Sequence, residues 1–191
     1  MSFTDDFTGT SGDYLESRTG WTLVDGAAGA AQINASNQLK NTSTQSVGSY
    51  ACTDQGSSDH YTQVDSYDTG NAFPAAVRMT DGNNGIIARY GTFQWQLFKR
   101  VSGSFTSLGT YTVSHTPGDT LYLEADSSDN ITVKINGTAR IGPVSETFNN
   151  TETQQGLYPR SSTADPWIDN FEAGALAVGG VANPWYYYAQ H

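Results

Sequence analysis

Two carboxylates lie two positions apart on a predicted strand, in the pattern Glu124-Ala125-Asp126. Alternate residues of a strand face the same side, so both acids would line one groove, as the proton donor and the nucleophile or base of a glycosidase do. A third acid in step with them is missing, because Asp129 follows Ser127-Ser128 in a predicted turn. We therefore interpret this stretch as a strand end leading into a hairpin, and we expect a protein that is not an enzyme.

A second set of residues has the chemistry of sugar binding, which combines aromatic rings with hydrogen-bonding side chains. Trp95, Tyr90 and Tyr122 could stack on a pyranose ring. The side chains that could bind its hydroxyl groups are Arg89, Gln94, Gln96 and Arg100. Trp95 also alternates in phase with Phe93 and Leu97, as a core residue does. We therefore favour core packing for Trp95 and predict that the arginines and glutamines are exposed. A solvated face without a ligand is the alternative.

The C-terminal end carries four consecutive bulky aromatic residues after a stretch, 173–183, that is rich in Gly, Ala and Val. The four are Trp185, Tyr186, Tyr187 and Tyr188. Large apolar groups exposed together mark contact sites, and Trp and Tyr are favoured interface anchors. We predict that they bind a partner chain from a flexible tether, with docking onto their own domain as the alternative. Residues 1–175 would then form the domain and 176–191 an extension.

The formal net charge of the 191-residue chain is -10, with only nine Lys and Arg residues and no run of them. Nucleic acids and anionic membranes are bound mainly by clustered basic residues, so neither is an expected partner. The lone Cys52 predicts a buried structural thiol, and we place His60 and His115 at the surface. The N-terminus lacks a basic segment and an apolar core, so we expect no signal peptide and synthesis in a host cytoplasm.

The elements that would position these residues are short strands joined by turns. Apolar and polar residues alternate in several runs, and Asn136-Gly137 favours a two-residue hairpin. Residues 76–141 are predicted to form a meander of antiparallel strands whose apolar side a second sheet must cover. The sequence thus predicts an all-β, two-sheet antiparallel jelly-roll sandwich. Its predicted core includes Trp95, Leu97, Leu121, Leu123, Val133 and Phe171.

The arrangement of these runs resembles the concanavalin A-like lectin/glucanase superfamily in its laminin-G-like branch. The stretches that carry the resemblance are 3–7, 84–90, 95–109, 121–125, 131–137 and 166–171. The resemblance implies that the first and last strands are neighbours. It also implies a possible structural calcium ion between them, held by Asp6 and Asp169 with Asp5 or Asn170 as helpers. The alternative is that these side chains cap turns, and no cofactor is expected to be required.

A small acidic jelly roll with an aromatic tail also resembles the accessory proteins of tailed-phage virions. That resemblance implies a non-catalytic structural role on a virion, as a capsid decoration, head fibre or tail module. The partners would be other virion proteins and further copies of the chain. The alternative is a carbohydrate-binding module or host-adhesion lectin that binds a cell-surface glycan. A polysaccharide-acting enzyme with an unrecognised site is the third interpretation.

Deleting residues 176–191 should leave the domain folded and its thermal transition little changed, since terminal extensions contribute few core contacts. The same deletion should abolish oligomerisation or attachment, as measured by size-exclusion chromatography with light scattering. Trp185→Ala should cost about 2 kcal/mol of binding free energy, roughly a thirtyfold loss of affinity. A truncated chain that unfolds more easily but still assembles would show that the tail packs on its own domain.

Overall fold

The computed structural model of the chain describes residues 2–42, 48–67, 75–91, 93–158 and 167–177. One sheet has eight strands, of which β1 (Ser2–Asp5) pairs only with β15. The others, in order, are β13 (Thr138–Ser145), β12 (Asn130–Ile135), β11 (Asp119–Ala125), β6 (His60–Ser66), β15 (Trp167–Ala175), β4 (Leu39–Asn41) and β3 (Ala31–Ile33). A short 3-10 turn, η1, spans Leu15–Ser17. In the part of the chain described, no helix is long and apolar enough to cross a membrane.

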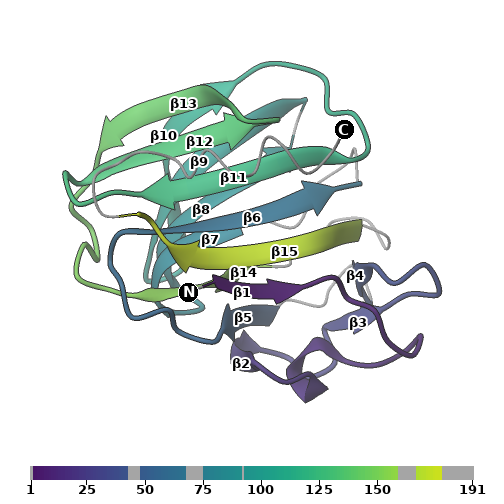
Figure 1. Ribbon diagram of the computed structural model, residues 1–191. Coiled ribbons are helices and arrows are strands. Elements are labelled where there is room, and N and C mark those ends of the chain that lie inside the picture. The colour runs from purple at the N-terminus through teal and green to yellow at the C-terminus, as the bar shows by residue number, and fades with distance from the viewer. Residues whose placement is uncertain (1, 43–47, 68–74, 92, 159–166, 178–191) are drawn as a thin grey trace.

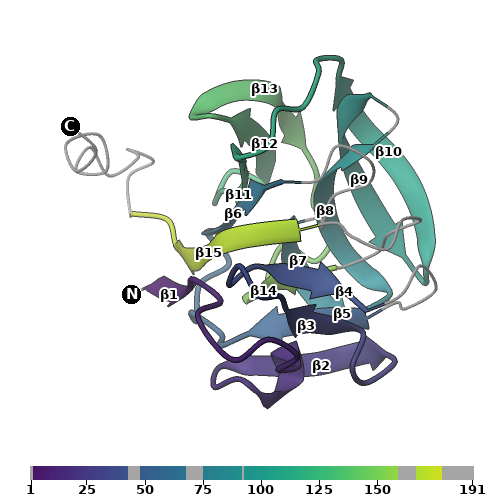
Figure 2. The same cartoon turned by 90° about the vertical axis from the view of Figure 1, so that its right-hand side faces the viewer.

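The second sheet has seven strands and faces the first, as Figures 1 and 2 show. In order these are β10 (Ser104–Tyr111), β9 (Gln94–Val101), β8 (Asn84–Gly91), β7 (Ala75–Asp81), β14 (Gln154–Leu157), β5 (Gly48–Cys52) and β2 (Trp21–Gly26). The pairings in both sheets are antiparallel. The predicted all-β sandwich is confirmed.

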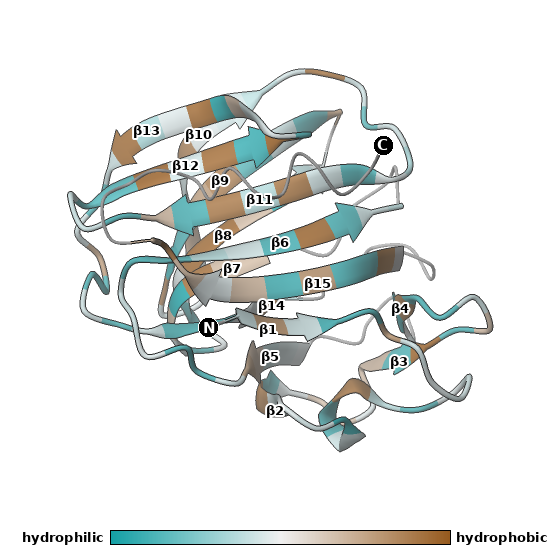
Figure 3. Ribbon diagram, viewed as in Figure 1, coloured by the Kyte–Doolittle hydropathy of each residue, from teal (hydrophilic) through white to brown (hydrophobic). Residues whose placement is uncertain are grey.

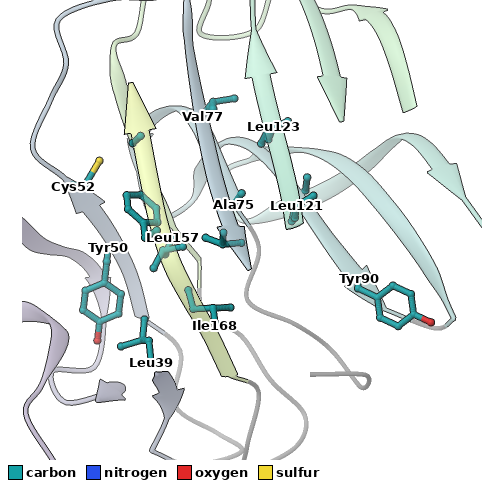
Figure 4. Close-up of a cluster of buried hydrophobic side chains, with 14 of the residues drawn as sticks. Leu39, Tyr50, Cys52, Ala75, Val77, Tyr90, Leu121, Leu123, Leu157 and Ile168 are labelled. Carbon is teal, nitrogen blue, oxygen red and sulfur yellow. The ribbon is translucent and has the colours of Figure 1, made fainter. Parts of the chain in front are cut away.

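The predicted single meander over 76–141 is wrong, because the chain changes sheets after β10. Strands β7 to β10 follow one another in the seven-stranded sheet, and β11 to β13 do so in the eight-stranded sheet. The division has a packing reason. It lets the apolar side of β7 lie against that of β11, with Ala75 and Val77 facing Leu121 and Leu123 across the interior (Figure 4).

The turn between β12 and β13 has the predicted conformation, whereas Phe93, predicted as part of a strand, lies in the turn before β9. Asn136 and Gly137 have φ angles of 50° and 75°, as the predicted type I′ turn between β12 and β13 requires. Phe93 was predicted to lie in phase with Trp95 and does not. It has a φ of 62° and lies in the turn between β8 and β9, where its side chain is 80% exposed. The alternation of β9 therefore begins at Gln94.

The core lies between the sheets, and every residue of the predicted core set is buried there. Figure 3 shows the period of two along β11 and β12, where apolar and polar residues alternate. Inward side chains of β11 alternate with Tyr122 and Glu124, which lie on the opposite side of their sheet. Cys52 is buried as predicted, and burial raises the pKa of its thiol to about 12.

The first and last strands pair, as the resemblance implied, with Asp5 opposite Phe171. Asp5 forms an ion pair with Arg18 at 2.5 Å and accepts a hydrogen bond from Trp21 Nε1 at 2.8 Å. The Trp21 ring packs edge-on against Phe171, with centroids 4.6 Å apart. One carboxylate therefore ties the N-terminal strand to η1, to β2 and to the core.

His60 and His115 are both buried, which contradicts their predicted place at the surface. His60 Nε2 accepts a hydrogen bond from the backbone N–H of Arg78 at 3.1 Å, so its other nitrogen carries the proton and donates to Ser57 O at 2.7 Å. Burial, and after it the positive charge of Arg78, lowers the pKa of His60 to about 4. The Arg78 side chain is itself buried and pairs with Asp129. His60 is therefore a neutral structural group.

His60 should make stability depend on pH in one direction. Its folded pKa of about 4 lies below the ordinary value of about 6.5. The unfolded chain therefore binds the proton first, and stability falls as the pH drops from about 6.5 to about 4, by on the order of 3 kcal/mol in total. His60→Gln, which keeps a donor and an acceptor, should lose this part of the pH dependence. Urea unfolding at pH 7 and pH 4 checks it, and equal pH dependence in both proteins would contradict the assignment.

Candidate functional site

The four side chains predicted to bind sugar hydroxyls lie together on the outer side of the seven-stranded sheet. Trp95 and Leu97 of β9 point into the core, so Gln94, Gln96 and Arg100 point outward. Arg89 of β8 pairs directly with Gln96, and cross-strand partners share a face. The alternation of one strand and the register of its neighbour are enough to bring the set together.

Arg100 forms the base of this face and is not exposed as predicted. Its side chain is only 8% exposed, and its guanidinium carbon lies 4.3 Å from the ring centre of Tyr158 and 5.2 Å from that of Phe105. Its nitrogens donate to the Gly82 carbonyl and, at 3.0 Å, to Asn83 Oδ1. Arg100 thus joins β9 to the β7–β8 turn. The rings of Tyr158 and Phe105 shield its guanidinium from water.

Arg89 and Gln96 form a second part of the face, in which Arg89 is the more accessible of the two. Arg89 Nε donates to Gln96 Oε1 at 3.0 Å, and the guanidinium lies 5.0 Å from the ring centre of Phe98. Gln96 is 8% exposed, which contradicts its predicted exposure, whereas Arg89 and Gln94 are half-buried. The glutamine was misplaced because neighbouring side chains on the same face cover it. Its oxygen orients Arg89.

A small hollow lies beside Arg100 on this face. Its lining includes Ala76, Met79, Gly85 and Tyr158. Ala76 and Gly85 leave room for the hollow because their side chains are small or absent. The surrounding apolar residues, among them Met79 and Ile87, form a cluster separate from the main core.

The Met79, Tyr158 and Arg100 side chains that meet at the hollow are buried, so the accessible groups of the face are those of Arg89, Gln94 and Phe98. A ring with guanidinium and amide groups beside it is the combination that binds a sugar's apolar face and its hydroxyls.

Phe98, Phe105 and Tyr158 complete the face and were not among the predicted residues. Phe98 could have been found, since it lies in phase with Gln94 and Gln96 along β9. Tyr158 follows β14, a strand far along the chain that is placed beside β7 only by the sheet order. No local pattern signals that contact.

The aromatic residues predicted as stacking platforms lie elsewhere. Trp95 and Tyr90 are buried in the core, where both rings pack against His115. Tyr122 lies on the outer side of the eight-stranded sheet, stacked on Tyr61 at 4.9 Å, and Lys134 Nζ lies 4.9 Å from its ring centre. Because Tyr61 and Lys134 pack against the Tyr122 ring, we do not assign this ring as a stacking surface for a sugar.

The two acids of the glycosidase-like pattern have structural partners. Glu124 forms an ion pair with Lys134 at 2.8 Å. Asp126 accepts hydrogen bonds from the backbone N–H groups of Ser128 and Asn130, at 2.8 and 2.9 Å, and so stabilises the turn after β11. The local prediction of a strand end leading into a hairpin is confirmed.

The predicted calcium ligands are close enough to influence one another. Burial raises the pKa of Asp169, and the negative charges of Asp65, Asp6 and Asp5 raise it further. Asp6 and Asp169 each accept a hydrogen bond from a nearby backbone N–H, at 3.0 and 2.8 Å, as in the turn-capping alternative. Across the described ranges, no three Asp, Glu, His or Cys side chains are grouped to hold a metal ion. Calcium binding stays a prediction.

The predicted partner-binding residues Trp185, Tyr186, Tyr187 and Tyr188 lie outside the described residues. The described part of the extension ends at residue 177, after a hydrogen bond from Leu176 N to Asp59 O at 2.8 Å. The anchoring role of the tail therefore remains a prediction from the sequence.

Comparison with known proteins identifies the fold of the chain. No protein-family model matches the sequence, and no curated protein matches it at a significant level. Among solved structures it is similar to the carbohydrate-binding module CBM66 from Bacillus subtilis, with 20% identity, a TM-score of 0.61, and coverage of 80% of this chain and 92% of that one. β-Agarase A in complex with oligoagarose has 14% identity, a TM-score of 0.64 and coverage of 91% of each chain.

The carbohydrate recognition domain of Emp46p is also similar, with 9% identity, a TM-score of 0.59, and coverage of 91% of this chain and 99% of that one. These structures confirm the concanavalin A-like jelly roll that the resemblance predicted. They do not bear on the laminin-G-like branch or on phage virions.

Replacing Arg100 should test whether its hydrogen bonds stabilise the fold. Arg100→Met removes donors from the Gly82 carbonyl and Asn83, and buried groups left unsatisfied cost about 1–3 kcal/mol each. The free energy of unfolding in urea should fall by about that amount. Arg140→Met, at an exposed position, is the matched control and should change stability by no more than about 0.5 kcal/mol. Equal effects of the two changes would show that the Arg100 contacts contribute little.

Proposed function

We propose that the chain is a non-catalytic carbohydrate-binding domain that binds a glycan on the outer face of its seven-stranded sheet. The observation that carries the proposal is the grouping of Arg89, Gln94 and Gln96 with the Phe98 ring beside the hollow at Arg100 and Tyr158. Aromatic and aliphatic groups bind the apolar side of a sugar, and guanidinium and amide groups bind its hydroxyls.

The structural neighbours support this alternative better than the predicted virion role. Those named above include a carbohydrate-binding module and a carbohydrate recognition domain. Jelly-roll folds host many functions, so the neighbours add to the argument from the face and do not replace it. The virion role depended on the aromatic tail, and it stays a prediction together with self-association.

The absence of catalysis is part of the proposal, and the distribution of carboxylates supports it. Strands β5, β8, β9, β10 and β14 contain no Asp or Glu. The nearby acids, Asp25 and Asp81, bond side chains or backbone of the β7–β8 turn. A glycosidase needs two carboxyl groups across the scissile bond, and the two acids on the described strands of this sheet, Asp25 and Asp81, are held in these turn contacts.

Gln94→Ala should weaken glycan binding by up to about tenfold, because a net hydrogen bond contributes about 0.5–1.5 kcal/mol. Gln63→Ala is the matched control, since Gln63 is a half-buried glutamine on β6 of the opposite sheet. A glycan array identifies a ligand for the full chain, and calorimetry with that ligand then compares the three proteins.

Two results would contradict the proposal. If the control lost as much affinity as Gln94→Ala, the glycan would not bind on the seven-stranded sheet. If the protein released reducing ends from the bound polysaccharide, the domain would be an enzyme with a site that these strands do not reveal.

A further inference from the structure

Phe93 is an aromatic residue that the fold leaves in water. It lies in the turn between β8 and β9, and its side chain is 80% exposed. Tyr14, the next most exposed large apolar residue of the described ranges, is 48% exposed. Burial of a phenylalanine is among the larger contributions that one side chain makes to stability. At position 93 the fold gains almost none of it.

The backbone at Phe93 is also unfavourable for a phenylalanine. Its φ is 62°, in the left-handed region that Gly, Asn and Asp adopt most readily. Nine described residues other than Gly have a positive φ, and six of them are Asn, Asp or Ser. Asn136 occupies such a position in the hairpin between β12 and β13. An Asn would suit the turn before β9 better, so stability does not account for a phenylalanine there.

Two other large side chains have a positive φ, and both differ from Phe93 in their contacts. Phe7 is fully buried and stacks on Trp21, with ring centres 6.4 Å apart. Arg78 is buried and pairs with Asp129. Contacts inside the protein offset the backbone cost at these two positions. No burial offsets it at Phe93, so the exposed ring is available for contact with another molecule.

The surroundings of Phe93 favour a sugar over a protein as the molecule that covers its ring. The next residue, Gln94, belongs to the candidate face, and consecutive Cα atoms are about 3.8 Å apart. One sugar unit can therefore stack on the ring and offer hydroxyl groups to the amide. A stable protein interface buries about 800 Å² on each partner, whereas one aromatic side chain buries about 150–250 Å². Among the described residues, only Val113 is a second exposed large apolar side chain near this turn, two positions after Tyr111, which pairs with Trp95.

We infer that the Phe93 ring is a stacking platform for one sugar ring of the glycan, at the end of the candidate face where β9 begins. The inference rests on the proposed function and adds a residue that determines which sugars bind. The Phe98 ring of the face is half-buried, with the Arg89 guanidinium 5.0 Å from its centre, so Phe93 offers the more open ring. The expected ligand contains a pyranose whose C–H groups form an apolar side beside its hydroxyls.

Phe93→Asn separates binding from stability, because the two should change in opposite directions. The variant removes the ring and places at the turn a residue that adopts the left-handed region readily. Its melting temperature should rise by about 2–4 °C, as expected for relief of one unfavourable backbone conformation in a chain of this size. Its affinity for the glycan should fall about tenfold, since truncated aromatic anchors have effects of this size. Scanning and titration calorimetry measure the two changes.

The ligand for these titrations is chosen with the full chain on an array of cello-, laminari-, xylo-, manno- and malto-oligosaccharides. Two further variants serve as controls. Phe93→Tyr keeps the ring and should keep most of the affinity. Tyr14→Asn removes an exposed ring beside the opposite sheet, where Tyr14 pairs with Gln32 of β3, and should leave the affinity unchanged.

Several results would overturn the stacking role and leave the carbohydrate-binding domain in place. They are unchanged affinity in Phe93→Asn, an equal loss in Tyr14→Asn, or a loss in Phe93→Tyr as large as that in Phe93→Asn. A lower melting temperature in Phe93→Asn would overturn it too, because the ring would then stabilise the fold. Loss of self-association in that variant, with glycan binding kept, would assign the ring to a contact between copies of the chain. If no glycan on the array bound, the proposed function would be wrong as well.

Discussion

The burial of Trp95 and Leu97 between the sheets sets the phase of β9, and the candidate face depends on that phase. Because side chains alternate along a strand, fixing two inward positions fixes every outward one. A slip of one residue would send Gln94, Gln96 and Arg100 into the core, where polar groups without partners are costly. The register of β8 on β9 then places Arg89 against Gln96. Packing of the interior therefore determines which polar groups gather outside.

Three arginines differ in burial, and burial determines whether a guanidinium stabilises the fold or can be reached by a ligand. Arg78 lies inside the end of the sandwich, where it bonds the loops after β11 and β13. Arg100 lies on the outer face but is covered by Tyr158 and Phe105. Arg89 is half-buried and oriented by Gln96. The first two stabilise chain connections, and the third retains the exposure that a ligand contact requires.

The fold itself is compatible with binding and with catalysis, since both kinds of protein share it. What differs between them is the set of side chains on the outer faces of the sheets. In this chain the strands beneath the candidate face carry arginine, glutamine and aromatic residues, and they carry fewer carboxylates than the strands of the other sheet. That distribution favours recognition of a ligand over cleavage of one.

The sequence alone determined what depends on near neighbours: the alternation that buries Trp95, the Asn136-Gly137 hairpin, the turn at Asp126 and the all-β class. It also grouped Arg89 with the outward residues of β9, because two strands joined by a tight turn must pair. It failed where distant segments meet. The change of sheet after β10 and the cover that Tyr158 gives Arg100 depend on strands far apart in the chain. Only packing of the two sheets decides how deeply each outward side chain is buried, and so which of them a ligand can reach.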